Sequence, residues 1–250
     1  MQLLPGKFVW FEHQSPDIPA ARRFHEDLFG WHTEMMPAGA DRYALIMNGS
    51  TGIGGFTALP AGSNALWRCY LSVADVDASY RRAVAAGAKS LQGPTNHGVV
   101  GRGALVQDPT GGIVALWTSA QGDQPDVPQA PPGNFCWTEL NTGDARRALA
   151  FYQQVIGYGH QTLATPQGSY HLLTKDGQQR GGLMQCSDGS LPTSWLPYVA
   201  VSSAEDTLAK AQALGARSLM PLQDVPDVGR MGLLHDPQGA HLAFIQLLQK

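Results

Sequence analysis

The sequence predicts an α+β fold built from tandem βαβββ modules, and three observations support this prediction. Residues 6–118 recur, with drift, in residues 133–246. Each copy alternates short β-branched and aromatic runs with two helix-like stretches. Matching turn signals separate these runs, such as Asp108-Pro109-Thr110-Gly111 in one copy and Asp236-Pro237-Gln238-Gly239 in the other. A fixed period of this kind is the signature of repeated structural units.

The first copy is predicted to contain two successive units, each with a strand, a helix and further strands. The expected elements are a strand over 7–14, a helix over 18–29, strands near 42–47 and 51–57, a strand over 66–73, a helix over 76–86, and strands near 89–92, 102–107 and 112–117. Asp17 is a suitable N-cap for the first helix, and Gly30 a suitable end for it. Asn48-Gly49 is a hairpin signal between two of the strands.

The second copy has the same organisation. Helices are expected over 145–156 and 204–214, the latter opened by Ser203 with Asp206 three residues later, as in a capping box. Between the copies, residues 120–132 are rich in proline and polar side chains, which is typical of a linker. We therefore expect a first domain over 1–119 and a second over 133–250, each of two modules. Pairing of modules is expected because a single one leaves a sheet face bare.

Composition excludes several classes of protein. The 250 residues are 43% hydrophobic, enough for two cores. The net charge of −3 argues against a nucleic-acid partner, which usually needs a clustered basic surface. Neither a secretory signal nor an apolar run of membrane-spanning length is evident, so we expect a cytoplasmic protein with no membrane partner. Three cysteines without a CxxC motif do not indicate a disulfide framework.

Several motifs that recur in order resemble the vicinal oxygen chelate superfamily, which includes glyoxalase I, extradiol dioxygenases and bleomycin-resistance proteins. They are Phe24 followed by Gly30-Trp31, Ala86-Gly87-Ala88, and the Asp-Pro-x-Gly turns. Within the superfamily, the chain is similar to a two-module glyoxalase-like subgroup. The resemblance implies two eight-stranded, cup-shaped sheets with helices on their outer face. It also implies that both cups can form in a monomer, while a homodimer stays open.

Enzymes of this superfamily hold a divalent metal in the cup, usually through His, Gln or Glu. The resemblance places the corresponding positions at Trp10, Trp137, Arg68, Leu196, Ala115 and Ala243. Divalent ions need carboxylate, imidazole or thiolate donors, which none of these side chains supplies. We therefore predict no cofactor at the usual site. A metal stays open only at a non-standard site, for which His171 and His235 could join His241 and Glu139.

Strand parity indicates what faces each cup instead, since side chains two residues apart share a face. If Trp10 and Trp137 point inward, so do Glu12 and Glu139. The candidate ligand-binding residues are Trp10, Arg68, Tyr70, Arg102, Trp117, Trp137, Tyr198 and Arg230. Aromatic side chains with a few polar anchors suit a small-molecule pocket. Arg102 and Arg230 could clamp an anion, but an ion pair with the Glu of their own module is the favoured interpretation.

The candidate catalytic residues are Glu139, His241 and Glu12. Either Glu could act as a general base or anchor a ligand donor, or be a structural carboxylate. His241 has Ile113 as its counterpart, so the two cups differ chemically.

Three functions remain open from sequence. The first is a module that binds a small aromatic or amphipathic molecule. The second is an enzyme: a metal-dependent lyase or dioxygenase with a non-standard site, or a metal-free enzyme that uses Glu139 and His241. The third is a scaffold whose cups are filled by side chains.

Overall fold

A computed structural model describes residues 2–38, 41–165, 168–186 and 192–249. Its helices are α1 (Ile18–Phe29), α2 (Val76–Ala85), α3 (Ala145–Ile156) and α4 (Ala204–Ala213). The strands of the first copy are β1 (Phe8–Ser15), β2 (His32–Ala38), β3 (Asp41–Asn48), β4 (Thr51–Ala58), β5 (Leu66–Ser72), β6 (Lys89–Asn96), β7 (Gly101–Gln107) and β8 (Ile113–Ser119). Those of the second are β9 (Phe135–Thr142), β10 (Gly159–Thr165), β11 (Gly168–Lys175), β12 (Gln178–Gln185), β13 (Ser194–Ala200), β14 (Arg217–Ser218), β15 (Gln223–Val225), β16 (Gly229–His235) and β17 (His241–Leu247).

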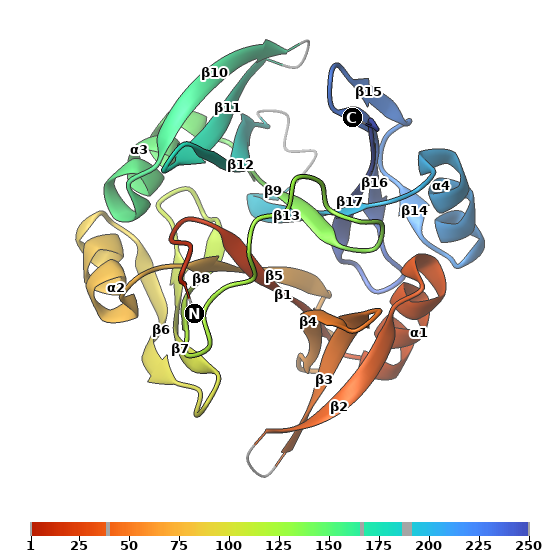
Figure 1. Cartoon of the computed structure of the whole chain (residues 1–250), viewed down its shortest axis with the longest axis horizontal. Coiled ribbons are helices and arrows are strands. Elements are labelled where there is room, and N and C mark those ends of the chain that lie inside the picture. Colours follow the sequence, from red (N-terminus) through yellow and green to blue (C-terminus); the bar gives the residue numbers. More distant parts are fainter. Residues whose placement is uncertain (1, 39–40, 166–167, 187–191, 250) are drawn as a thin grey trace. The chain divides into compact units, whose positions relative to one another are not determined.

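These strands form two mixed sheets, one from each copy (Figure 1). The first sheet has eight strands in the order β2-β3-β4-β1-β5-β8-β7-β6. The second has nine, in the order β10-β11-β12-β9-β13-β17-β16-β14, with β15 also paired to β16. In both, the first strand of each module pairs in parallel with the last, as in β1 with β4, β5 with β8, β9 with β12 and β13 with β17. The predicted α+β fold of tandem βαβββ modules is confirmed.

Local sequence explains where the helices begin and end. The side chains of Asp17, Asp75, Asp144 and Ser203 each accept a hydrogen bond from a backbone N–H of the first turn. Gly30 and Gly157 end α1 and α3 in the left-handed conformation, at φ of 74° and 77°, where a glycine avoids steric cost.

Two details of the sheets differ from the sequence prediction. The edge strand β2 was not predicted, because its sequence (His-Thr-Glu-Met-Met-Pro-Ala) has a single β-branched residue and contains a proline. The second sheet has nine strands because the region equivalent to β6 is divided into β14 and β15. Pro221 lies in that interruption, and proline cannot donate to a strand ladder.

The chain divides into two compact units that each take residues from both copies. Unit 1 comprises residues 1–10, 68–126 and 137–196, and unit 2 comprises 11–67, 127–136 and 197–250. The backbone passes from one unit to the other within four strands, which are β1, β5, β9 and β13.

Each unit buries its own helices. In unit 2, α1 and α4 share an apolar cluster that includes Phe24, Leu28, Ala211, Leu234 and Phe244. In unit 1, α2 contacts α3, and Arg82 of α2 donates to the carbonyl of Val155 at 3.2 Å. No helix among the described residues is both long and apolar enough to cross a lipid bilayer.

Candidate functional site

In unit 1, a buried carboxylate lies beside a tyrosine and a tryptophan. Glu139 on β9 is 6% exposed and is hydrogen-bonded to the hydroxyl of Tyr170 on β11. The indole N–H of Trp137 donates to the same hydroxyl at 2.8 Å. Trp137 and Glu139 therefore share one face of the strand, as parity predicted, while the next residue, Leu140, is fully buried on the opposite face.

Unit 2 contains the counterpart of this arrangement in the first copy. The hydroxyl of Tyr43 on β3 donates to Oε1 of Glu12 on β1 at 3.0 Å, and Glu12 is 8% exposed. Both glutamates thus have a tyrosine partner from the same position of the repeat.

The paired glycines of the sequence explain how the tyrosines reach the carboxylates. A Cβ atom at Gly182 would collide with the hydroxyl of Tyr170, and one at Gly55 would collide with that of Tyr43. Each tyrosine therefore crosses a glycine to reach its glutamate. Sequence reasoning missed both tyrosines, although a signal was present: Tyr43 and Tyr170 occupy equivalent places in the repeat, two strands from the glutamates.

Burial keeps Tyr170 protonated. Removal of its hydroxyl from water raises the pKa of Tyr170, and the nearby charge of Glu139 raises it further, which outweighs the hydrogen bond from Trp137. The tyrosine is therefore a hydrogen-bond donor to Glu139 at any ordinary pH, and not a general base.

Substitution of Gly182 by alanine is expected to displace Tyr170 from Glu139. The new Cβ occupies the place of the tyrosine hydroxyl, and overpacking of this kind costs about 1–3 kcal/mol. Urea denaturation measures the cost. Gly143→Ala is the matched control, because a Cβ there meets nothing within 4 Å. Equal stability of the two variants would contradict the close packing of Tyr170 on Gly182.

The candidate arginines bind other acids than those predicted. Arg102 forms a bidentate pair with Asp77, at 2.7 and 2.9 Å, and also binds Asn96. Arg230 lies 3.1 Å from Glu205 and 3.7 Å from Asp224. The predicted pairs with the glutamate of the same module are wrong, because each arginine lies near the helix or strand that flanks its own strand. Their role in ligand binding stays a prediction.

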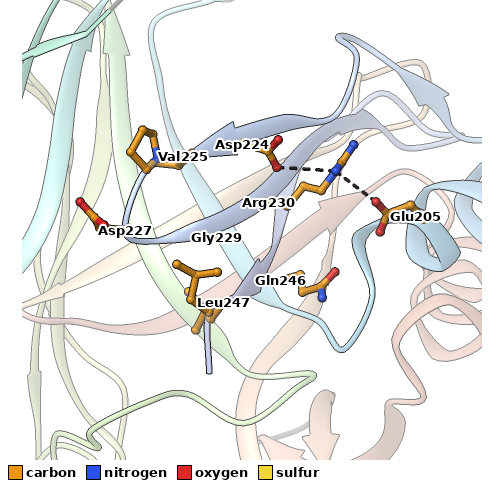
Figure 2. Close-up of a pocket in the computed structure, with 10 residues that line it drawn as sticks. Glu205, Asp224, Val225, Asp227, Gly229, Arg230, Gln246 and Leu247 are labelled. Atoms are coloured by element: carbon orange, nitrogen blue, oxygen red, sulfur yellow. Dashed lines mark ion pairs between the residues drawn. The ribbon is translucent and has the colours of Figure 1, made fainter. Parts of the chain in front are cut away.

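Arg230 and its two acids line a pocket of about 430 Å³ in unit 2 (Figure 2). The remaining wall includes Val225, Gln246 and Leu247. Arg230 is 44% exposed and already neutralised by carboxylates. We therefore do not assign the ligand site to this pocket.

The catalytic candidate His241 has surroundings of its own. It is paired across the ladder with His235, with ring centroids 5.1 Å apart. Burial lowers the pKa of His241, and His235 and Arg217 lower it further against the opposing charge of Asp236. Glu139 belongs to unit 1 and His241 to unit 2, so neither unit contains both. His171 lies on β11 in unit 1, hydrogen-bonded to Thr162 at 3.0 Å.

The other aromatic candidates lie on neighbouring strands. Tyr70 and Trp117, on β5 and β8 of unit 1, meet edge to face with ring centroids 5.8 Å apart. Arg68 precedes Tyr70 on the same face of β5, and its buried Nε has no hydrogen-bond partner among the described residues. Trp10 lies in the unit 1 part of β1, and Tyr198 on β13 of unit 2 is buried.

The absence of the usual metal ligands stays a prediction, because it depends on the positions that the resemblance assigns. The side chains at those six positions are indole, guanidinium, isobutyl and methyl groups, none of which coordinates a divalent cation well. Elsewhere among the described residues, one group of three side chains brings its ligand atoms within 4.8 Å of one another: His13, His25 and Asp236 of unit 2.

Comparison with known proteins agrees with this fold. The sequence profile described as "Glyoxalase-like domain" matches residues 10–116 and 137–245. The chain belongs to the glyoxalase-like family. It is 32% identical over 238 residues to the putative glyoxylase CFP32 of Mycobacterium tuberculosis, covering 92% of this chain and 91% of that protein. It is 26% identical over 264 residues to the anthracycline biosynthesis protein DnrV of Streptomyces peucetius, covering 97% and 94%.

Solved structures share the fold of this glyoxalase-like chain. The Mn(II)-bound glyoxalase of Novosphingobium aromaticivorans superposes with a TM-score of 0.69 at 14% identity, covering 98% of this chain and 83% of that one. The 2,2′,3-trihydroxybiphenyl 1,2-dioxygenase of Sphingomonas wittichii RW1 gives 0.67 at 15% identity, covering 98% and 92%. At these identities the likeness concerns the fold.

Proposed function

We propose that this glyoxalase-like protein binds a small aromatic or amphipathic molecule, anchored at the glutamate–tyrosine pairs and without the metal of its superfamily. The observation that carries the proposal is the buried Glu139, held by Tyr170, beside the indole of Trp137. A buried carboxylate is costly unless it is hydrogen-bonded, and it accepts hydrogen bonds from hydroxyl or amine groups strongly. Indole and phenol rings beside it suit a flat apolar partner.

The relatives support this class of ligand. One is named for anthracycline biosynthesis, and one structural neighbour for the dioxygenation of a trihydroxybiphenyl, both of them hydroxylated aromatic ring systems. Phenolic hydroxyl groups are donors that match a carboxylate acceptor. We expect Arg68 to contribute a further donor, because its buried Nε has no partner among the described residues.

The chemistry of the side chains supports metal-free binding. Trp10, Trp137 and Ala115 occupy positions that the resemblance assigns to metal ligands, and none of them coordinates a cation well. We expect elemental analysis of the purified protein to give far less than one equivalent of Mn, Fe or Zn. EDTA should leave ligand affinity unchanged. A stoichiometric metal that EDTA removes together with binding would overturn this part of the proposal.

The experiment is a thermal-shift and calorimetric titration with hydroxylated biphenyls and anthraquinones. A ligand that binds the folded state raises the melting temperature by mass action. We expect Glu139→Gln to weaken binding at least tenfold, since loss of a charged hydrogen-bond acceptor costs about 1.5–3 kcal/mol. The matched variant Glu12→Gln reports whether the first sheet takes part. Glu34→Gln, which makes the same change at an exposed carboxylate outside the proposed site, serves as the control.

Two outcomes decide against the proposal. One is the absence of any shift across the panel of hydroxylated aromatics. The other is binding that both glutamate variants leave unchanged, because the carboxylates would then not be the anchors.

A further inference from the structure

The core of unit 2 contains a polar cluster that the proposed ligand site does not use. It comprises His13 of β1, His25 of α1, Asp236 after β16 and Trp67 of β5, all of them buried, with both histidines at 0% exposure. Nε2 of His13 lies 2.7 Å from Oδ2 of Asp236. Oδ1 of Asp236 accepts from the backbone N–H groups of Gln238 and Ala240, at 2.8 and 2.9 Å.

Three atoms of this cluster lack a hydrogen-bond partner among the described residues: Nδ1 of His13, Nε2 of His25 and Nε1 of Trp67. Nδ1 of His25 lies 2.9 Å from the carbonyl of Ala21, to which it donates, so the neutral ring presents Nε2 as an acceptor. That Nε2 and the indole Nε1 of Trp67 have no hydrogen-bond partner among the described residues. Buried polar atoms of this kind call for an explanation, usually a water or an ion.

Unit 1 contains the equivalent cluster with different side chains. The repeat places Leu140 at the position of His13 and Tyr152 at that of His25. The hydroxyl of Tyr152 accepts from Nε1 of Trp195 at 2.8 Å and donates to Oδ2 of Asp108 at 2.8 Å. In unit 1, one oxygen atom thus joins the indole to the carboxylate. Histidine at the equivalent position is shorter and carries no oxygen.

We propose that the cluster of His13, His25, Trp67 and Asp236 is a binding site for one internal water molecule, which replaces the tyrosine hydroxyl of the other unit. The water accepts from the indole of Trp67 and donates to Nε2 of His25 and Oδ2 of Asp236. These two acceptors are 3.9 Å apart, too far for a direct bond but within reach of one water that makes bonds of about 2.8 Å. Three hydrogen bonds are typical of a buried water.

A metal ion would use the same three ionisable side chains, but the geometry favours water. The distance of 2.7 Å between His13 and Asp236 is that of a hydrogen bond. Two ligands of one tetrahedral zinc, each about 2.0–2.1 Å from the ion, lie about 3.3 Å apart. The indole N–H of Trp67 also needs an acceptor, which an oxygen supplies and a cation does not.

The water site explains why the two histidines occur together. In unit 1, one tyrosine hydroxyl satisfies both the indole and the carboxylate. In unit 2, His13 donates directly to Asp236, and the water serves Trp67 and His25. Without His13, the carboxylate of Asp236 would lose its direct side-chain donor.

The test is a crystal structure of the full chain at about 1.5 Å, with anomalous data collected above the zinc edge. We expect one oxygen peak within 2.6–3.2 Å of Trp67 Nε1, His25 Nε2 and Asp236 Oδ2, without anomalous signal. A peak about 2.0 Å from both histidines, with anomalous signal, would replace the water by a metal. A direct contact between Trp67 and His25 with no peak would also overturn the proposal.

A variant that copies the side chains of the other unit gives an independent result. In His13→Leu/His25→Tyr, the new hydroxyl should take the position of the water, and the peak should disappear. In solution, the Trp67 indole N–H should show a cross-relaxation peak with water in the wild type, assigned by Trp67→Phe, and lose it in the double variant. If the double variant does not fold, the wild-type density and the indole signal still decide, since the absence of both contradicts a bound water.

Discussion

Replacement of Tyr152 by phenylalanine is expected to lower the free energy of unfolding by about 3–5 kcal/mol. Tyr152 is 1% exposed, and its hydroxyl is the partner of both Asp108 Oδ2 and Trp195 Nε1. Its removal takes one hydrogen-bond donor from the buried carboxylate of Asp108. It also removes the acceptor of the buried indole N–H of Trp195. Breaking a buried, charge-assisted network by removal of one partner typically has a cost of this size.

Burial and the charge of Asp108 raise the pKa of Tyr152, so the hydroxyl stays a donor throughout the measurement. Urea denaturation at neutral pH measures the effect. Tyr80→Phe is the matched control, because it deletes the same atom from an exposed bond to Ser90, and it should cost less than about 1 kcal/mol. Similar losses for the two variants would show that the Tyr152 hydroxyl carries no more than a surface bond does.

The same network shows how far the sequence predicts the fold. The repeat, the helix caps and the Asp-Pro-x-Gly turns predicted the modules, and the structure confirms them. The aspartate of that turn also has a structural task that the motif alone does not reveal. Asp108 accepts from the backbone of its own turn, at Thr110 and Gly112, and from a tyrosine of the other copy. The contact with Tyr152 arises because unit 1 contains residues from both copies.

The site was only partly predictable for the same reason. Parity correctly put Trp137 and Glu139 on one face, because it depends on residues close together in sequence. The tyrosine partners and the acids paired with Arg102 and Arg230 come from neighbouring strands and helices, whose register the sequence does not encode locally. The histidine cluster was missed altogether, since His13, His25 and Asp236 come from opposite ends of the chain.

Mild acid is expected to destabilise unit 2 through His25. Burial, together with the neighbouring His13, lowers the pKa of His25 to about 3, although Asp236 and the Ala21 carbonyl act in the opposite direction. The unfolded value is about 6.5. Between pH 6.5 and 3 the unfolded chain therefore binds a proton that the folded chain does not. Stability from this group is fully present above pH 6.5 and decreases as the pH falls towards 3.

The slope of this loss is at most about 1.4 kcal/mol for each pH unit, so unfolding at pH 4.5 should cost about 2–3 kcal/mol less than at pH 7. Asp236 adds a loss only at lower pH. Burial opposes its charged form, but the hydrogen bond with His13 and the charges of both histidines together outweigh burial and lower the pKa of Asp236 to about 2. Acid thus acts first on the histidine and only later on the carboxylate.

Guanidinium denaturation at a series of pH values tests this order. His25→Tyr, which places a group that does not titrate in this range at the same position, should flatten the curve between pH 6.5 and 4.5. His32→Gln removes an exposed histidine of the same unit, about half accessible to solvent, and should leave the curve unchanged. Equal flattening by both variants would mean that acid acts through general charge repulsion. If the curve stays steep in His25→Tyr, another buried group causes the loss of stability in acid. His241 is the first to test, because burial lowers its pKa as well.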